Sequence, residues 1–132
     1  TKIERYTFPV ELNEVSRPFF EQTAKVEMPS LAAAMRAIVA NPADTVAAAT
    51  ISKDPRYASM LRTSCVATRL AAGHADNALP QTATANINCR VAPTSSGADV
   101  KLVLERLIAD TIVKVTMRGG DRNNAGGKPS PI

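Results

Sequence analysis

The 132-residue sequence predicts an α+β fold, with a helical first half and a second half in the order strand, strand, helix, strand. Three observations support this prediction. Before residue 61, Ala-rich segments are broken by Pro at nearly regular intervals; residues 82–91 alternate between apolar and polar; residues 97–109 repeat apolar side chains at helical spacing. The length suits one domain, and 45% hydrophobic residues suffice for a modest core, which must be largely aliphatic because aromatics are only 4%.

The first half is expected to form short helices separated by Pro-containing turns. The expected segments are the end of a helix over 1–6, a linker over 8–15, and helices over 16–26, 29–40, 43–51 and 55–61. Ser16 is the expected N-cap of its helix, with Pro18 in the first turn, where a missing N–H removes no hydrogen bond. In the 29–40 helix, one apolar stripe is formed by Leu31, Met35, Ile38 and Val39.

Two strands are expected over 62–71 and 82–91, joined by residues 72–81. Because side chains of a strand alternate between faces, the second strand has one apolar and one polar face. The apolar face carries Ala85, Ile87, Cys89 and Val91, and the polar face carries Thr84, Asn86, Asn88 and Arg90. Pro80 belongs to the connection, since it cannot donate to a central ladder.

A helix is expected from Gly97 to Ala109, with Ser96 as N-cap and Asp99 in the first turn. Its stripe consists of Val100, Val103, Leu104, Leu107 and Ile108. A third strand is expected over 111–117. Three strands leave the sheet open at one edge, which indicates a further strand upstream that this sequence does not contain. Residues 118–132 are rich in Gly and Pro and are expected to be a linker or a disordered tail.

Composition excludes several function classes. The net charge is +4, but Lys and Arg are scattered without interleaved aromatics, so nucleic-acid binding is not expected. No stretch approaches the ~20 apolar residues of a membrane span, and no secretory signal opens the chain. The sequence begins Thr-Lys-Ile without Met, which we interpret as a segment excised from a longer protein.

Cys65 and Cys89 fall in the two expected strands. The expected state is two buried thiols, because a free Cys behaves as a small hydrophobe. A bridge between neighbouring strands is the alternative. A catalytic Cys is less well supported, because Cys89 lies on an apolar face with no base nearby in the sequence.

His74 is the only His in the chain, and three interpretations stay open for it. His74 and Asp76 form a His-x-Asp pair of zinc-ligand types, but a zinc site needs three or four protein ligands. Alternatively, Asp76 and Asn77 cap a turn, and His74 is a polar loop residue. The third interpretation is a site shared with another domain or chain.

Residues 62–116 resemble the lid, or dimerisation, domain of the zinc exopeptidases that include aminoacylases, carnosinases, bacterial carboxypeptidases and succinyl-diaminopimelate desuccinylase. The lid's Asn-x-(Ile/Leu)-Pro turn matches Asn77-Ala78-Leu79-Pro80. The alternating strand with Arg90, a loop with Pro93, a helix over 96–109 and a strand over 112–116 follow in the family's order. Residues 8–61 resemble, more weakly, the enlarged lid of the larger carboxypeptidases.

The catalytic domain of the same family also carries a His-x-Asp motif, which His74-Ala75-Asp76 could imitate. However, the Asn-Ala-Leu-Pro turn and the alternating strand that follow belong to the lid pattern. The family's Glu-Glu pair and its other metal-binding positions are not found in this sequence. No catalytic residue and no metal ligand are therefore expected in this chain.

The resemblance implies a ferredoxin-like antiparallel sheet with helices on one face, together with a helical insertion. It divides the chain into a helical part of the lid (1–61), a lid and dimerisation core (62–117) and a linker or tail (118–132). The candidate substrate-binding residues are Asn77, His74 and Arg90. In the family, the lid Asn reaches substrate, and the strand Arg contacts a substrate carboxylate in some members; Arg90 fits a structural ion pair equally well. The family's lid His belongs to a Gly-His-Ser-like motif that this sequence lacks, so its role does not carry over to His74.

The implied function is that of a lid and dimerisation domain excised from a zinc-dependent metallopeptidase or amidohydrolase that cleaves an amide bond next to a free carboxylate. In such a parent, zinc-activated water attacks and a Glu of the catalytic domain acts as base. The fragment alone is expected to be inactive. Its implied partners are its own catalytic domain, a second copy in a homodimer, and a peptide or N-acyl amino acid substrate. The alternatives are a free-standing ferredoxin-like module that binds a small ligand or a protein, and a small enzyme with a His74–Asp76 dyad.

Overall fold

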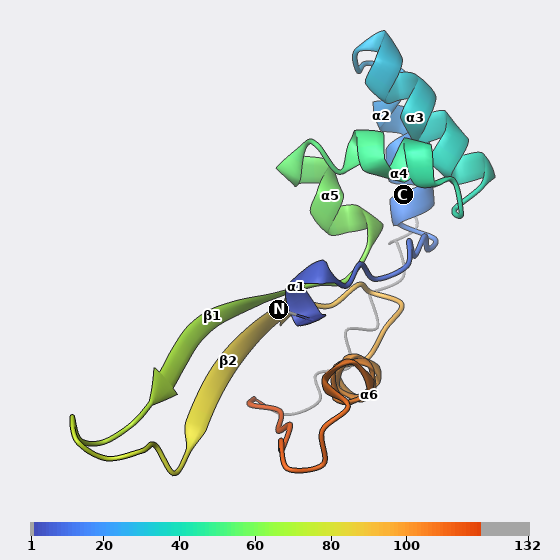
Figure 1. The fold of residues 1–132 in the computed structure, drawn as a ribbon. Coiled ribbons are helices and arrows are strands. Elements are labelled where there is room, and N and C mark those ends of the chain that lie inside the picture. The colour runs from blue at the N-terminus through green and yellow to red at the C-terminus, as the bar shows by residue number, and fades with distance from the viewer. Residues whose placement is uncertain (1, 120–132) are drawn as a thin grey trace.

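The chain folds as an α+β structure with a cluster of helices at one end and a long two-stranded hairpin at the other (Figure 1). The computed structural model describes residues 2–119. The helices are α1 (Lys2–Arg5), α2 (Ser16–Thr23), α3 (Pro29–Ala40), α4 (Thr45–Ile51), α5 (Pro55–Leu61) and α6 (Gly97–Ile108). The strands are β1 (Ser64–Ala72) and β2 (Ala83–Arg90). The predicted fold class is confirmed, and the described sheet corresponds to half of a ferredoxin-like one.

Local sequence signals fix the starts of three helices in the first half. Pro29 and Pro55 occupy the first turns of α3 and α5, where the missing N–H removes no hydrogen bond. Asp44 caps α4, accepting hydrogen bonds from the backbone N–H groups of Val46 (3.0 Å) and Ala47 (2.9 Å). Asp54 caps α5 through the N–H of Arg56 at 2.9 Å. These helices lie where the sequence predicts them.

The prediction that Ser16 is the N-cap of α2 is wrong. Val15 holds the cap position and forms no side-chain cap bond. Instead, the Asn13 Oδ1 atom accepts hydrogen bonds from the N–H groups of Val15 (3.0 Å) and Ser16 (2.7 Å), while the Ser16 Oγ atom accepts one from the Asn13 N–H at 2.9 Å. An Asn side chain bonds readily to backbone two or three residues ahead, so the turn begins earlier than the Ser suggests. The helix also ends earlier, at Thr23 rather than near residue 26.

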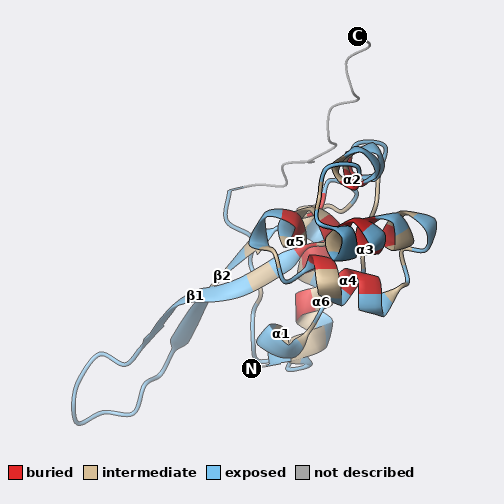
Figure 2. Ribbon diagram, turned by 90° about the horizontal axis from the view of Figure 1, so that it is seen from above, coloured by how far each residue is buried: buried red, intermediate tan, exposed pale blue. Residues whose placement is uncertain are grey.

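The principal hydrophobic core lies among α2, α3, α4 and α5 (Figure 2). Its fully buried side chains are Phe20, Met35, Ile38, Ile51 and Leu61. Met35 and Ile38 come from the predicted stripe of α3, and Leu31 and Val39 pack against the same cluster while partly exposed. Four short helices thus enclose one core built from Ala, Leu, Ile, Met and a few aromatic residues.

The two predicted strands are confirmed and pair antiparallel as β1 and β2. One residue of β1, Thr68, has no partner, so it forms a β-bulge between Ala67 and Arg69. The Asn86 side-chain amide donates to the Thr68 hydroxyl oxygen at 2.8 Å across this bulge. Because the bulge absorbs one residue, the alternation of β1 stays matched to that of β2. One face then carries Cys65, Ala67, Leu70 and Ala72 opposite Cys89, Ile87, Ala85 and Ala83.

Helix α6 covers only the root of this apolar face, the end nearest the helical cluster. A second cluster forms there around Phe8, Val100 and Leu104. The partly buried side chains that pack against it include Ile3, Tyr6, Cys65, Ile87, Cys89, Val103 and Leu107. The predicted cap of α6 is confirmed as a capping box: the Asp99 N–H donates to the Ser96 Oγ atom at 3.1 Å, and the Ser96 N–H donates to the Asp99 carboxylate at 3.0 Å.

The predicted third strand over 111–117 is wrong. After α6, Ala109 adopts a left-handed conformation (φ 50°), and Asp110 forms a turn by accepting the Ile112 N–H at 2.9 Å. The segment then runs without ladder bonds, and Ile112 is 91% exposed. A strand needs a neighbour for its backbone groups, and within residues 2–119 the sheet has only two strands, which pair with each other.

The expectation of two free thiols is also wrong. Cys65 and Cys89 lie directly opposite each other in the register and form a disulfide, 24 residues apart in the sequence. The alternative of a bridge between neighbouring strands therefore holds. Its cause is the strand register, which sets these two side chains side by side on one face.

Candidate functional site

The hairpin loop carries two of the three candidate site residues. His74 and Asn77 lie in the connection between β1 and β2, in which every residue from Gly73 to Thr82 is exposed. Gly73 opens the loop with φ of 79°, a left-handed conformation that side chains other than Gly rarely adopt. The loop forms the far tip of the hairpin, away from all six helices (Figures 1 and 2).

Arg90 lies at the opposite end of the hairpin. It is the last residue of β2, opposite Ser64, and its side chain is exposed on the polar face. Seven residue steps separate it from Ala83 at the loop end of β2, a length of about 23 Å at the usual rise of a strand. One copy of the chain therefore does not bring Arg90 together with His74 and Asn77. No ion pair of Arg90 is found within residues 2–119, so the alternative of a structural ion pair has no partner there. The substrate-contact role of Arg90 stays a prediction.

The described residues do not fit a zinc ion. Within residues 2–119, no group of three or more His, Cys, Asp and Glu side chains is placed to hold a metal. His74 and Asp76 are exposed in the loop, and both Cys are used in the disulfide.

Most of the hairpin is uncovered in the described chain. All residues from Val66 to Asn86 are exposed, including Val66, Leu70 and Leu79. Both long edges of the two-stranded sheet are unpaired within the described part. Free edges present rows of N–H and C=O groups that accept another strand, and an isolated two-stranded hairpin is only marginally stable in water. This surface is therefore suited to association with another chain or domain.

Two residues that the sequence interpretation did not single out connect the helical cluster to the hairpin root. Glu11 accepts hydrogen bonds from the hydroxyl groups of Thr94 and Ser95 (2.8 Å from the Ser95 Oγ atom) in the loop before α6. Arg62, directly after α5, donates from its Nη1 atom to the Phe8 carbonyl oxygen at 3.3 Å. Neither residue has a local motif, because its partners lie more than fifty residues away in sequence.

Among residues 2–119, none of the helices has both the length and the apolar character that a bilayer-spanning segment requires.

Comparison with known proteins identifies the domain. A family model described as the peptidase dimerisation domain matches residues 23–116. The match begins at the end of α2 and continues beyond α6, so it includes α3, α4 and α5 together with the hairpin. No curated protein and no solved structure gives a significant match. Because the matched segment is well over half of the 132 residues, the chain belongs to the peptidase dimerisation domain family of the M20 peptidases.

Proposed function

We propose that this dimerisation domain serves as the lid of a zinc-dependent metallopeptidase or amidohydrolase that cleaves an amide bond next to a free carboxylate. The family match supports a dimerisation module of a peptidase, and the hydrolase chemistry rests on the resemblance of residues 62–116. The zinc ion would be held by the catalytic domain of the parent, because the described residues do not fit it. The chain by itself would then be inactive.

The exposed hairpin is the observation that supports association of this domain with a second copy. A second copy of this chain would offer the same two free edges and the same apolar side chains, so a two-fold interface can be self-complementary. Leu70 of β1, on the apolar face of the hairpin, would lose exposed surface in such a contact. Association would also give the hairpin the additional strands that a stable sheet needs.

The separation within the hairpin limits how substrate could be bound. The loop tip with His74 and Asn77 and the root with Arg90 lie a hairpin length apart, so they would serve sites completed by other parts of the assembly. At the tip, the Asn77 amide could donate to a peptide or N-acyl amino acid, with His74 in the same exposed loop. At the root, Arg90 could bind a carboxylate through its two-pronged guanidinium.

The test is sedimentation equilibrium of the 132-residue chain over a range of concentrations, with Leu70→Glu as the disrupting variant. We expect a reversible dimer in the unmodified chain and a shift to monomer in the variant, because a carboxylate in a two-fold contact meets its own counterpart. The matched control is Val26→Glu, since Val26 is 85% exposed and Leu70 is 77% exposed, but Val26 lies in the helical cluster. A monomer at all concentrations, or a dimer lost in the control alone, would contradict the proposal.

A further inference from the structure

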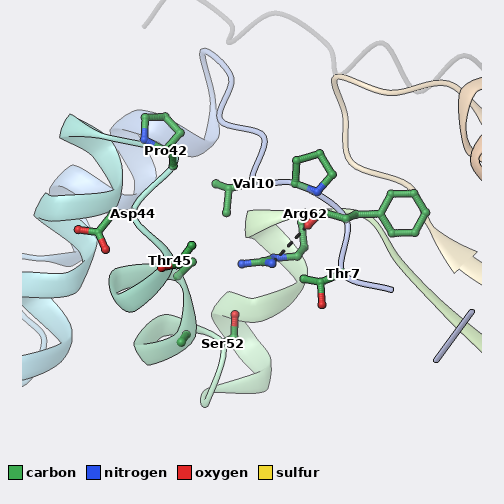
Figure 3. Close-up of a pocket in the computed structure, with 12 residues that line it drawn as sticks. Thr7, Val10, Pro42, Asp44, Thr45, Ser52 and Arg62 are labelled. Atoms are coloured by element: carbon green, nitrogen blue, oxygen red, sulfur yellow. Dashed lines mark hydrogen bonds between the residues drawn. The ribbon is translucent and has the colours of Figure 1, made fainter. Parts of the chain in front are cut away.

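A cavity of about 720 Å³ lies between the helical cluster and the chain segment that leads to the hairpin (Figure 3). Three segments line it together with Arg62: the stretch 7–10, the turn 42–45 before α4, and one face of α4. It is a groove open to solvent, and its volume falls in the range of small-molecule sites, about 300–1,000 Å³. It is distinct from the hairpin surface and from His74, Asn77 and Arg90.

Arg62 brings a positive charge to this cavity. In Figure 3 its guanidinium extends toward Thr45, between Val10 and Ser52. The Nη1 atom donates to the Phe8 carbonyl oxygen at 3.3 Å, and the Nε atom is buried without a hydrogen-bond partner among the described residues. Partial burial lowers the pKa of Arg62, although an Arg stays protonated in proteins. A buried N–H of a charged group that lacks a partner is energetically costly. The described residues therefore leave part of the hydrogen-bonding capacity of the Arg62 guanidinium unused.

The remaining polar groups around Arg62 define the charge that suits the cavity. Thr7, Thr45 and Ser52 are among the lining residues, and each carries a hydroxyl group that can donate a hydrogen bond. Asp44 also lines it; its Oδ1 atom is used as the cap of α4, and its negative charge opposes an incoming dianion. With one Arg and one Asp among its lining residues, the site carries little net charge, which disfavours a dianionic phosphate more than a singly charged carboxylate. A carboxylate also matches the fork of an Arg.

The walls favour a ligand with an apolar body. The lining residues without polar side chains are Phe8, Pro9, Val10, Pro42, Ala43, Ala48 and Ala49. Several are small, which leaves the volume open. An inorganic anion would leave this apolar surface uncovered, whereas an aliphatic or aromatic body would bury it.

We propose that this cavity binds a small organic monocarboxylate, with the carboxylate on the outer edge of the Arg62 guanidinium and the apolar body against Val10 and Ala49. The site goes beyond the proposed lid function, because it uses none of the hairpin residues. Its failure would leave the dimerisation test unaffected.

The experiment is a titration of the ¹⁵N-labelled 132-residue chain with sodium benzoate, followed by the amide resonances of residues 42–52 and the side-chain Nε–H resonance of Arg62. We expect saturable shifts with a Kd of roughly millimolar order, as suits a small ligand held by one charged contact. Benzamide, which has the same ring without the charge, should shift these resonances weakly or not at all. Inorganic phosphate should bind more weakly than benzoate.

Two variants test the two halves of the proposed site. Arg62→Met should weaken benzoate binding at least about tenfold, the equivalent of ~1.4 kcal/mol, whereas Arg56→Met should not. Because Arg62 also bonds to the Phe8 carbonyl, a second variant, Ala49→Leu, narrows the cavity from an exposed helix position, with Ala33→Leu on α3 as its control. Absence of saturation, equal shifts with benzamide, tighter binding of phosphate, or benzoate binding unchanged in Ala49→Leu would each overturn the proposal.

Discussion

The helical cluster and the hairpin differ in how completely each is folded within the chain. In the cluster, α2 to α5 enclose Phe20, Met35, Ile38, Ile51 and Leu61 with no exposed surface. In the hairpin, every residue from Val66 to Asn86 is exposed, and only the root is covered by α6. Helices bond their own backbone groups, whereas strands need neighbours, so one region is complete and the other is open to partners. The hairpin is therefore expected to contribute little to the stability of the isolated chain.

The largest expected difference between the regions concerns apolar side chains. Ile51→Ala should lower the free energy of unfolding by about 2–5 kcal/mol, because it leaves a cavity in a closed core. Leu70→Ala should change it by no more than about 0.5 kcal/mol, because that side chain is exposed. Urea denaturation below the dimerisation concentration measures both. Equal losses would show that Leu70 is packed in solution rather than exposed.

The disulfide is a covalent restraint on the hairpin root. Its removal should therefore increase the difference in stability between the hairpin and the helical cluster. By the loop-closure argument, a bridge between residues 24 apart in the sequence contributes about 3.5 kcal/mol. We expect the double change Cys65→Ser and Cys89→Ser, or reduction by dithiothreitol, to abolish amide-exchange protection in β1 and β2. Protection in α3 should persist. Uniform loss of protection along the chain would instead mean that the cluster depends on the hairpin.

Glu11 links the regions directly, and its loss should have an intermediate effect. Glu11→Gln should destabilise the chain by about 1–2 kcal/mol, because a charge-assisted acceptor for the hydroxyl groups of Thr94 and Ser95 becomes neutral. A double-mutant cycle with Ser95→Ala checks the assignment. If the two losses simply add, Glu11 stabilises the chain through some other contact.

The smallest expected effect is the pH dependence of the α6 cap. Hydrogen bonds from the Ser96 hydroxyl and then from its backbone N–H hold the pKa of Asp99 below its ordinary value of 3.8. A carboxyl whose pKa is lowered on folding stabilises the protein fully above the unfolded-state pKa and loses this contribution as the pH falls through the folded-state pKa. Amide exchange in the first turn of α6 should therefore accelerate in that acidic range, less so in Asp99→Asn. An unchanged acid dependence in the variant would assign it to another carboxyl group, such as Asp54, whose pKa is lowered by the side chain of Arg56.

The accuracy of the sequence-based predictions follows the same division between local and distant contacts. The Asp54-Pro55 start of α5 and the Ser96 capping box are written in neighbouring residues, and both were predictable. The pairing of Cys65 with Cys89 depends on a register that no local pattern specifies. Residues 111–117 have the alternation of a strand, but a strand also requires a partner, which alternation cannot supply. The cavity at Arg62 brings together segments from three parts of the chain, which sequence spacing does not reveal.

The bulge at Thr68 has a consequence for how this domain can vary in length during evolution. If Thr68 itself were deleted, the bulge would disappear and the remaining residues of β1 would keep their partners in β2. If another residue of β1 were deleted, the pairing would be kept only if the unpaired position moved along the strand. Inserting one residue between Arg69 and Ala72 would turn the following side chains of β1 to the opposite face. Relatives are therefore expected to place single-residue length changes in the loop from Gly73 to Thr82, whose backbone is free of the ladder, and to keep the spacing from Thr68 to Ala72 constant.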